Sequence, residues 1–410
     1  MSNRTMEKSR EIMLNEHKYN CRNYAPLPVV LKEGHGSIVE DVDGFKYLDC
    51  LMGYASVNLG HGNERIHKVI TSQVTKLYMT ARAFYNDKLH ETAKLLCETF
   101  GKEKVCFANG GVEGVETALK LARRWAYRVK KIEDNKAKII FAKGNFMGRT
   151  ITVCGASEDK GRYLQFGPYV QDAFHLVPYN DIKSIADLLE SDPNICAVFL
   201  EPIQGEGGIV IPDNDYLSNV YDLCKKHNVL YIDDEIQAGL GRSGKLLASE
   251  YSLKEKKPDM IILAKSITNG YYPVSCVLAD KVIMDGIGPG EHGSTFSGNP
   301  LGMAIANAAI KELIADQGKL IKNSFDIGAK ICYLLYSLNS PLIKEVRGRG
   351  LFIGIEFHHD IPVEVSDIGL LLMEKGLITK QTHKYNIRLT PPINIGFKEA
   401  EAIYHIFKNV

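Results

Sequence analysis

Short apolar runs alternate with amphipathic segments between about residues 60 and 300. The runs include residues 104–108 (KVCFA), 138–142 (KIIFA), 229–233 (VLYID) and 260–264 (MIILA). Runs this short and this apolar are typical of strands buried on both faces, and the segments between them have the period of helices. The alternation predicts a largely parallel sheet covered by helices, with functional residues at the carboxyl ends of its strands.

The pattern changes near residue 300, where residues 301–320 (LGMAIANAAIKELIADQGKL) predict one long helix. The shorter elements that follow predict a smaller α+β unit. At 410 residues the chain exceeds the usual size of one core, which favours two domains. We expect an N-terminal segment over 1–59 that contributes to the small domain and the edge of the site, a large domain over 60–305 and a small domain over 306–410.

Composition narrows the class of partner. A hydrophobic content of 45%, a charged content of 24% and a formal charge of +1 are those of an ordinary globular protein, with no basic field for nucleic acid or acidic membranes. No apolar run approaches the roughly 20 residues of a membrane span. We therefore expect a small-molecule partner, without nucleic acid or membrane.

The cysteines and the N-terminus bear on the compartment. Nine cysteines, odd in number and without a C-x-x-C, favour reduced thiols over a disulfide frame or a zinc site. The first 20 residues have no apolar core and carry Glu7, Glu11 and Glu16, which argues against a targeting peptide. We expect a cytosolic or organelle-interior protein and, without a targeting signal, a cytoplasmic one.

Residues 229–244 (VLYIDDEIQAGLGRSG) contain three successive acids and a G-x-G-x-x-G. Side chains of a strand alternate between its faces, so Asp233, Asp234 and Glu235 cannot converge on one metal ion. A dinucleotide-binding loop leads directly from a strand into a helix, whereas here DDEIQA intervenes. We expect no metal site and interpret the glycines as a loop, with a nucleotide-dependent dehydrogenase as a remote alternative.

Lys265 follows the apolar run 260–264 directly. Burial at such a position lowers the pKa of the amine and leaves it able to form a Schiff base with a carbonyl. The alternative is a lysine that merely extends to solvent from a strand end. Asp234 stands at the carboxyl end of a second strand, and a pyridoxal phosphate (PLP) site needs both a lysine and a carboxylate for the pyridinium nitrogen. The pair favours a PLP site.

A phosphate could bind at two further places. Gly110 and Gly111 precede a predicted helix, whose first backbone N–H groups are free to bind an anion. Ser294 and Thr295 supply hydroxyls in a glycine-rich loop. A plain glycine turn and ordinary loop polarity are the alternative interpretations.

Several motifs, taken in order, carry a family resemblance. The chain resembles the fold-type I, class III PLP-dependent aminotransferases, and among them the ornithine δ-aminotransferase group, over nearly its whole length. The matching motifs are FMGRT (146–150), EPIQGEGG (201–208), DDEIQAGLGRSGKLLA (233–248), ILAKSITNGYYPVSCVL (262–278) and PGEHGSTFSGNPLG (289–302). The resemblance implies an α/β fold, with a large domain around a mostly parallel sheet flanked by helices and a smaller α+β domain.

The resemblance also implies roles around the cofactor ring. Lys265 would hold PLP through a Schiff base and then move the proton between substrate and cofactor. Asp234 would pair with the pyridinium nitrogen and keep the ring an electron sink. Gln237 would hydrogen-bond the phenolic oxygen, and Phe146 would stack on the ring.

The phosphate and the subunit arrangement follow from the same resemblance. Gly111 and Val112 would donate backbone N–H groups to the phosphate. Ser294 and Thr295 would reach the phosphate of the cofactor in the neighbouring subunit. The resemblance therefore implies a homodimer with shared active sites.

The implied reaction moves the δ-amino group of L-ornithine to 2-oxoglutarate, giving L-glutamate and glutamate 5-semialdehyde, which cyclises to pyrroline-5-carboxylate. Arg149 would bind the carboxylate far from the reacting centre, and Tyr24 and Tyr54 would lie near the α-amino end of ornithine. Arg388 would bind the α-carboxylate of glutamate or 2-oxoglutarate, because arginine suits carboxylates. Glu206 would neutralise Arg388 while ornithine is bound.

Tyr54 favours ornithine, since the related acetylornithine and 4-aminobutyrate transaminases usually carry an aliphatic residue there. Met147 stands where ornithine enzymes often have an aromatic residue. The alternatives are another class III ω-aminotransferase, acting on N-acetylornithine, 4-aminobutyrate or lysine, and a non-catalytic binding protein of the same fold.

Overall fold

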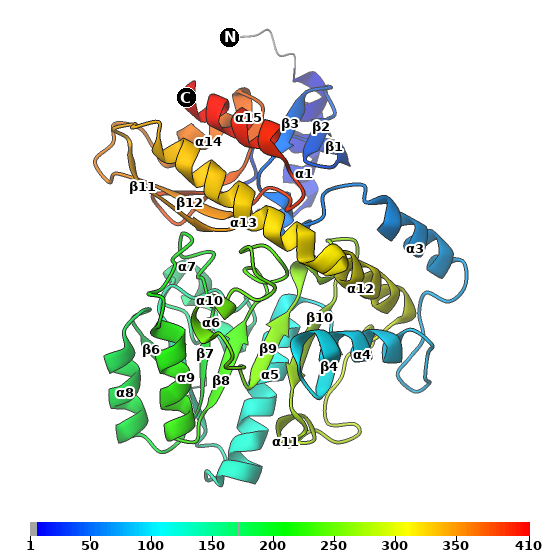
Figure 1. Ribbon diagram of the computed structural model, residues 1–410, viewed down its shortest axis with the longest axis vertical. Helices are drawn as coiled ribbons and strands as arrows, with labels where there is room; N and C mark the ends of the chain where they lie inside the picture. The colour runs from blue at the N-terminus through cyan, green and yellow to red at the C-terminus, as the bar shows by residue number, and fades with distance from the viewer. Residues whose placement is uncertain (1–5, 171) are drawn as a thin grey trace.

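The computed structural model describes residues 6–170 and 172–410 of the chain. A seven-stranded sheet lies in the lower half of Figure 1, in the order β4-β10-β9-β8-β7-β5-β6. Strands β9, β8, β7, β5 and β6 are parallel to one another, and β10 is antiparallel to β4 and β9. The strands are β4 (Lys104–Ala108), β5 (Lys138–Ala142), β6 (Phe174–Val177), β7 (Ile195–Leu200), β8 (Leu230–Asp234), β9 (Met260–Leu263) and β10 (Ser275–Ala279). The predicted largely parallel sheet is confirmed, with β10 as its one reversed strand among the described residues.

Helices cover both faces of this sheet. Alternate strand residues, such as Ile232 of β8, pack with the apolar stripe of α5, and the intervening ones, such as Tyr231, pack on the opposite face. At Gly114 of α5 an added Cβ would lie 3.1 Å from Ile262, so this position lets the helix approach the sheet closely. The covering helices are α4 (Leu89–Phe100), α5 (Gly111–Trp125), α8 (Ile182–Ser191), α9 (Tyr216–Lys226) and α12 (Pro300–Leu313).

Two four-stranded sheets lie in the other half of the molecule (Figure 1). One has the order β1-β2-β3-β13, so N-terminal strands pair with a strand close to the C-terminus. The other has the order β11-β12-β15-β14 and is antiparallel. Their strands are β1 (Leu31–His35), β2 (Ile38–Asp41), β3 (Lys46–Asp49), β11 (Ile343–Arg349), β12 (Phe352–Phe357), β13 (Leu377–Ile378), β14 (Lys380–Thr382) and β15 (Asn386–Leu389). The accompanying helices are α13 (Ala315–Tyr336), α14 (Val365–Glu374) and α15 (Phe397–Lys408).

The long helix expected over 301–320 is interrupted. Helix α12 ends at Leu313, and α13 begins at Ala315. Asp316, Gln317 and Gly318 have φ angles of 49°, 56° and 76°, which are left-handed and cannot continue a right-handed helix. The prediction of one continuous helix is therefore wrong. The helical spacing of apolar residues continues past residue 313, but the backbone of residues 316–318 is not helical.

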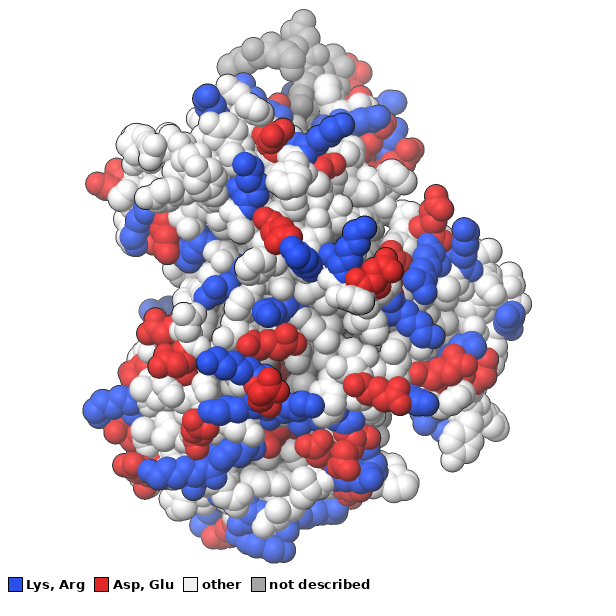
Figure 2. All heavy atoms as spheres, viewed as in Figure 1, with Lys and Arg blue, Asp and Glu red and all other residues white. Residues whose placement is uncertain are grey.

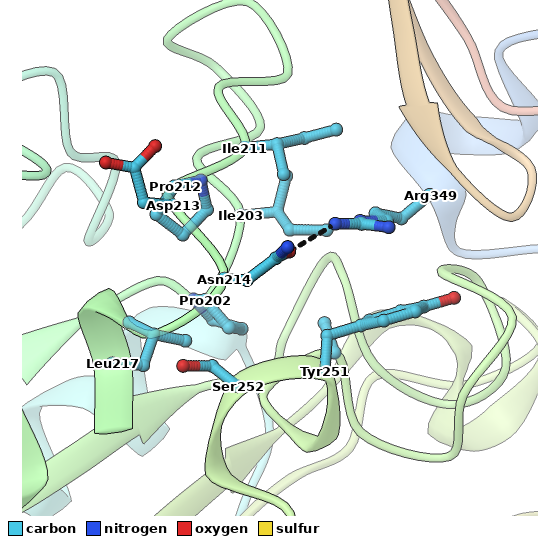
Figure 3. Close-up of a pocket in the computed structure, with 11 residues that line it drawn as sticks. Pro202, Ile203, Ile211, Pro212, Asp213, Asn214, Leu217, Tyr251, Ser252 and Arg349 are labelled. Carbon is cyan, nitrogen blue, oxygen red and sulfur yellow. Dashed lines mark hydrogen bonds between the residues drawn. The ribbon is translucent and has the colours of Figure 1, made fainter. Parts of the chain in front are cut away.

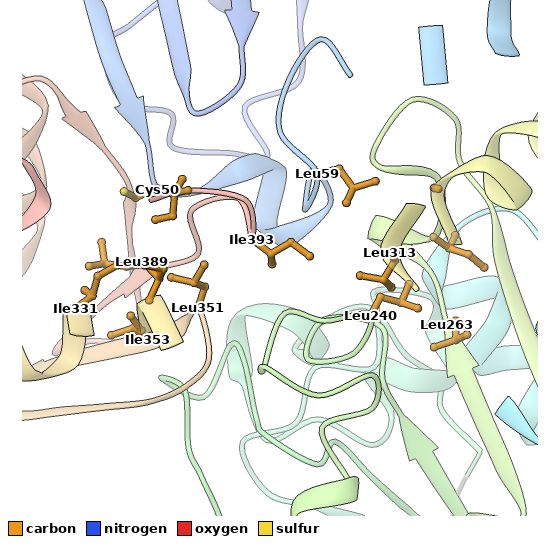
Figure 4. Close-up of a cluster of buried hydrophobic side chains, with 14 of the residues drawn as sticks. Cys50, Leu59, Leu240, Leu263, Leu313, Ile331, Leu351, Ile353, Leu389 and Ile393 are labelled. Carbon is orange, nitrogen blue, oxygen red and sulfur yellow. The ribbon is translucent and has the colours of Figure 1, made fainter. Parts of the chain in front are cut away.

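One apolar core joins the large sheet to the two smaller ones. It contains Leu240 and Leu263 at the carboxyl edge of the large sheet, Leu313 of α12, Leu389 of β15 and Leu351 of the turn between β11 and β12, together with Leu48 of β3. Figure 4 shows Leu351 and Leu389 on one side and Leu240, Leu263 and Leu313 on the other, with Ile393 between the two groups. Because these residues are buried together, the loops at the carboxyl edge of the large sheet are held against the C-terminal strands.

Short helices and the surface complete the fold. The remaining helices are α1 (Glu7–Tyr19), α2 (Met52–Ala55), α3 (Glu64–Val74), η1 (Ala126–Lys130), α6 (Ile151–Cys154), α7 (Lys160–Tyr163), α10 (Glu250–Leu253), η2 (Lys265–Thr268) and α11 (Lys281–Met284). Positive and negative side chains are interspersed over the face in Figure 2. Among the described residues, no helix is both long and apolar enough to cross a membrane.

Candidate active site

Three chemically active side chains lie at the carboxyl edge of the large sheet. Asp234 is the last residue of β8, Lys265 follows β9 after one residue, and Glu201 follows β7 directly. Strands β7, β8 and β9 are adjacent and parallel, so their carboxyl ends meet at one edge. This edge is where open α/β sheets bind ligands.

Lys265 has an unusual backbone and a perturbed amine. Its φ of 47° is left-handed, a conformation that a lysine adopts only where its surroundings require it. Burial lowers the pKa of the Lys265 amine, although the carboxylates of Asp234 and Glu206 act to raise it. A larger share of the amine is therefore unprotonated than in a free lysine, as a nucleophile requires.

Asp234 lies on the α5 face of the sheet, the same face as Ile232 two residues earlier. Its Oδ1 accepts a hydrogen bond from the N–H of Ile236 at 3.0 Å. Burial raises the pKa of the Asp234 carboxyl to about 6, while that hydrogen bond and the Lys265 charge act to lower it. A cationic partner at this carboxylate would lower its pKa again and hold it ionised.

The two neighbouring acids do not share the position of Asp234. Asp233 is buried on the opposite face of β8 from Asp234. Glu235 accepts the N–H groups of Ala248 at 2.9 Å and Ser249 at 2.8 Å. The three acids do not converge, as the alternation predicts. No group of three or more His, Cys, Asp or Glu side chains in the described chain could hold a metal ion.

The glycine-rich loop after β8 carries a buried arginine, which sequence reasoning did not identify. Arg242 is wholly buried and donates to the side-chain oxygen of Asn58 at 2.5 Å and to the carbonyl of Leu351 at 2.9 Å. It also donates to the carbonyl of Pro391. The loop therefore ties the N-terminal segment and the C-terminal strands to the large sheet.

The N-terminus of α5 is open to an anion. The Glu113 carboxylate accepts the N–H groups of Asn109 at 2.6 Å and Gly110 at 2.9 Å. The next two N–H groups, of Gly111 and Val112, have no acceptor in the described chain. A Cβ added at Gly110 would meet nothing within 4 Å. Free donors and open space at the start of a 15-residue helix suit a phosphate.

The second predicted phosphate loop lies beside the first. Ser294 accepts a hydrogen bond from the side-chain amide of Asn109 at 2.8 Å, so its hydroxyl lies near the start of α5. Thr295 is exposed. Both hydroxyls stand on the loop between α11 and α12.

Phe146 lies between the sheet edge and two arginines. Its backbone N–H donates to the Glu201 carboxylate at 2.9 Å. The guanidinium of Arg162 lies 4.7 Å from the centre of the Phe146 ring, and that of Arg149 lies 5.8 Å from it. The two guanidinium groups therefore hold the aromatic ring beside the sheet edge.

Glu206 and Arg388 form an ion pair. Arg388, in β15, is only 1% exposed, and its guanidinium donates to the Glu206 carboxylate at 2.6 Å. Burial acts to raise the pKa of Glu206, but the Arg388 charge and hydrogen bond lower it below its ordinary value. The guanidinium lies 5.5 Å from the ring centre of Tyr54, whose φ of 59° is also left-handed.

Gln237 connects this pair to the loop of Asp234. Its Nε2 donates to the carbonyl of Tyr54 at 3.3 Å and to the Glu206 carboxylate at 3.4 Å. An added Cβ at Gly205 would lie 1.7 Å from the Gln237 side-chain oxygen, so any larger residue there would displace the Gln237 amide. The EPIQGEGG loop and the loop after β8 are therefore packed together.

Arg149 is the second candidate carboxylate-binding group. It is exposed, and no carboxylate of the described residues lies within salt-bridge distance of it. Its guanidinium lies 5.6 Å from the ring centre of Tyr24, which is itself 61% exposed. A cavity of about 380 Å³, lined by residues that include Arg162, Glu206 and His383, opens next to the ion pair.

Another pocket has no part in this arrangement. Figure 3 shows it between α9, α10 and the end of β11, with Arg349 donating to Asn214 at 2.8 Å. The Arg349 guanidinium lies 4.7 Å from the Tyr251 ring centre. The volume of this pocket, about 20 Å³, holds little more than one water molecule, and no predicted site residue lines the pocket. It is a packing contact between the two halves.

These residues fit PLP. A nucleophilic amine and a carboxylate lie at one sheet edge, a helix N-terminus offers free N–H donors, and the backbone of an aromatic residue is bonded to the acid at the same edge. Every predicted site residue lies within the described chain. Besides Arg242, the sequence prediction omitted Glu201, although Glu201 follows an apolar run as directly as Asp234 ends one.

Comparison with known proteins identifies the family. The family model for class III aminotransferases matches residues 19–410. A relative from Caenorhabditis elegans, named as a probable mitochondrial ornithine aminotransferase, is 45% identical over 393 residues, which are 96% of this chain and 91% of the relative. The identity is high enough, and the coverage long enough, to establish common ancestry along the whole fold.

Solved structures agree. The crystal structure of the ornithine aminotransferase of Toxoplasma gondii matches with a TM-score of 0.94 and 38% identity, covering 98% of this chain and 94% of that one. An acetylornithine aminotransferase of Elizabethkingia anophelis matches with a TM-score of 0.88 and 40% identity, covering 98% of each chain. The chain belongs to the class III aminotransferases, the PLP-dependent transaminases of fold type I.

Proposed function

We propose that the protein transfers the δ-amino group of L-ornithine to 2-oxoglutarate, giving L-glutamate and glutamate 5-semialdehyde, which cyclises to pyrroline-5-carboxylate. The observation that carries the proposal is the pair between the buried Arg388 and Glu206 at 2.6 Å, with Tyr54 against the guanidinium. Ornithine aminotransferases among the relatives, at 45% identity, support the same substrate.

Bound PLP would supply an electron sink for the charge left on the substrate carbon when its proton is removed. Lys265 would hold the cofactor covalently and, once released, carry that proton. Its lowered pKa favours the free base that this task needs. Asp234, buried and ionised by a cationic ring nitrogen, would keep that nitrogen protonated.

Three further contacts would orient the cofactor. The free N–H groups of Gly111 and Val112 would bind its phosphate, and Phe146 would stack on its ring. Gln237 would donate to its phenolic oxygen, since its side-chain amide already lies within hydrogen-bond distance of Glu206 and of the Tyr54 carbonyl.

The ion pair would allow one site to accept two substrates. Ornithine must present its δ-amino group with no carboxylate next to the reacting carbon, so Arg388 would stay paired with Glu206. Glutamate and 2-oxoglutarate carry an α-carboxylate, which would take Arg388 from Glu206. Bidentate pairing makes arginine well suited to this exchange.

The far end of either substrate would meet Arg149. Its guanidinium has no carboxylate partner in the described chain and stacks near Tyr24 and Phe146. A carboxylate from the substrate would supply that partner. Tyr24 and Tyr54 would lie along the α-amino end of ornithine.

We further propose a homodimer in which Ser294 and Thr295 reach the cofactor phosphate of the partner subunit. Thr295 is exposed in the isolated chain, as a residue that meets a second subunit would be. Size-exclusion chromatography with light scattering tests the dimer. A serine-to-alanine change at position 294 in one subunit of a mixed dimer, with Lys265→Ala in the other, tests the sharing.

Two organisational proposals accompany this function. We propose a division into an N-terminal segment over 1–59, of which 1–5 lie outside the described residues, a large domain over 60–305 and a small domain over 306–410. Limited proteolysis near residue 305 tests it. We also propose a cytoplasmic location, consistent with nine cysteines that are all free thiols. Cell fractionation tests it against the mitochondrial location in the name of the Caenorhabditis elegans relative.

The second candidate is another class III ω-aminotransferase, because an acetylornithine aminotransferase is also a structural neighbour. Tyr54 favours ornithine, since it lies against Arg388 and its half-buried hydroxyl suits a polar α-amino end. Initial rates on L-ornithine, N-acetylornithine, 4-aminobutyrate and L-lysine decide between the candidates. We expect ornithine to be fastest, and a slower rate than with N-acetylornithine or 4-aminobutyrate would reject the proposal.

A further inference from the structure

Glu201 occupies a central position at the sheet edge without a role in the chemistry described above. It follows β7 and is only 7% exposed. One carboxylate oxygen accepts the N–H of Phe146 at 2.9 Å, and the other accepts the N–H of Gly205 at 3.3 Å. Its carbonyl accepts the Tyr179 hydroxyl at 2.8 Å.

The two N–H groups belong to different loops. Phe146 stands on the loop after β5, and its aromatic ring would cover the cofactor. Gly205 directly precedes Glu206, the partner of Arg388. One carboxylate therefore connects the loop at the ring face to the loop of the ion pair, and both to the sheet.

We propose that Glu201 is a positioning residue, which fixes the Phe146 loop and the Glu206 loop relative to each other. Both the stacking of Phe146 on the cofactor and the Glu206–Arg388 exchange would then depend on this one carboxylate. The proposal rests on the function proposed above. Burial and the charge of Asp234 raise the pKa of Glu201 to about 8, while the two backbone N–H groups act to lower it. Burial removes the carboxyl group from water, so both hydrogen bonds are needed to replace its lost hydration.

Glu235 offers a matched comparison. It is also a buried glutamate at a strand end and also accepts two backbone N–H groups, at 2.9 and 2.8 Å. Those N–H groups belong to Ala248 and Ser249, in a segment that carries none of the proposed site residues. The two glutamates differ in which loops they hold, and not in burial or in the kind of bond.

The test compares Glu201→Gln with Glu235→Gln. A glutamine has one acceptor oxygen, so its amide would oppose the N–H of either Phe146 or Gly205. For E201Q we expect the equilibrium affinity of the apoprotein for PLP to fall about tenfold, the equivalent of one or two lost hydrogen bonds. We also expect the rate of the L-ornithine half-reaction, relative to that of L-glutamate, to fall about tenfold. E235Q should keep both quantities within about twofold of the unaltered protein.

Equal behaviour of the two variants in both measurements would overturn the proposal. A loss of PLP affinity without a change in the ratio would overturn the part that concerns the Glu206 loop. Should E201Q not fold, Glu201→Asp retains both acceptor oxygens but withdraws them by one methylene, and we expect a smaller loss in the same two quantities. An unaltered protein that binds PLP but does not react with L-ornithine would reject the proposed function alone, because the PLP affinities of E201Q and E235Q still test Glu201.

Discussion

Glu206→Gln tests the ion pair that we hold responsible for dual substrate use. The substitution keeps the shape of the side chain and one acceptor oxygen but removes the charge. Arg388, at 1% exposure, would remain a buried cation whose nearest other acceptor is the Gln237 oxygen at 3.5 Å. A free Arg388 would attract the carboxylate of ornithine away from Arg149 and would still bind the α-carboxylate of glutamate.

The size of the effect follows from the geometry. Two unit charges about 4 Å apart interact by about 4 kcal/mol at an effective dielectric constant of about 20. The Glu206 side chain is 25% exposed, and glutamine keeps a hydrogen bond, so roughly half of that energy, about 2 kcal/mol, should be lost. Since about 1.4 kcal/mol is a factor of ten, the ratio of the ornithine to the glutamate half-reaction should fall about 30-fold.

Single-turnover absorbance of the PLP-loaded protein, with each amino acid alone, measures the two half-reactions separately. Glu356→Gln is the control, because Glu356 also contacts an arginine, Arg347, at 2.6 Å but lies outside the proposed site. In this control the ratio of the ornithine to the glutamate half-reaction should stay within about twofold of that of the unaltered protein. A Glu206→Gln variant in which both half-reactions slow by the same factor would refute the exchange mechanism.

Four further predictions follow from other parts of the site. Tyr54→Val should lower the kcat/KM for ornithine relative to 4-aminobutyrate by about tenfold in initial-rate assays, and an unchanged ratio would remove Tyr54 from substrate selection. Lys265→Ala should abolish the visible absorbance of covalently held PLP and its trapping by borohydride, and a coloured, borohydride-sensitive variant would exclude Lys265. Burial raises the pKa of Asp234 to about 6 and that of Glu201 to about 8. The folded apoprotein therefore holds these protons more tightly than the unfolded chain does. The resulting stability is fully present below about pH 4 and is lost as the pH rises through 8. The free energy of unfolding of the apoprotein, measured by urea denaturation, should fall between pH 5 and pH 8, and it should fall less in Glu201→Gln. An equal fall in the two proteins would contradict the prediction. Arg242→Gln should lower the free energy of unfolding by about 2 kcal/mol, because it leaves buried carbonyl and amide oxygens without a donor, and unaltered urea denaturation would contradict this.

Local sequence signals placed the centre of the proposed site at the carboxyl edge of the sheet. Lys265 and Asp234 each end a short apolar run, and in a parallel sheet such ends converge. The free N–H groups of Gly111 and Val112 follow from a glycine pair before a periodic helix. Each of these signals is contained within about ten residues, so local sequence could predict where these groups stand, whereas the role of Val112 came from the family resemblance.

Contacts between distant segments were not predictable from the residues themselves. The Glu206–Arg388 pair joins residues 182 apart, and only the family resemblance suggested it. The burial of Arg242 depends on Asn58 and Pro391, so the spacing of the glycines around it gave no indication. A backbone reversal inside an apolar period, as at Asp316, likewise leaves the hydrophobic pattern unchanged.

Glu201 was missed for a different reason. Residues 195–200 form a buried run that ends in an acid, the same signal that identified Asp234. Its importance becomes visible only when the loops of Phe146 and Gly205 are seen to meet at one carboxylate. An acid at the end of every strand in the sheet therefore merits the same attention as a lysine.

The most direct test of the proposed function is the half-reaction with L-ornithine alone. The purified protein, loaded with PLP and mixed with L-ornithine without a keto acid, should lose the absorbance of covalently held PLP. It should release one equivalent of glutamate 5-semialdehyde per site, and Lys265→Ala should release none. An unchanged spectrum with L-ornithine, together with rapid conversion by N-acetylornithine or 4-aminobutyrate, would contradict the account.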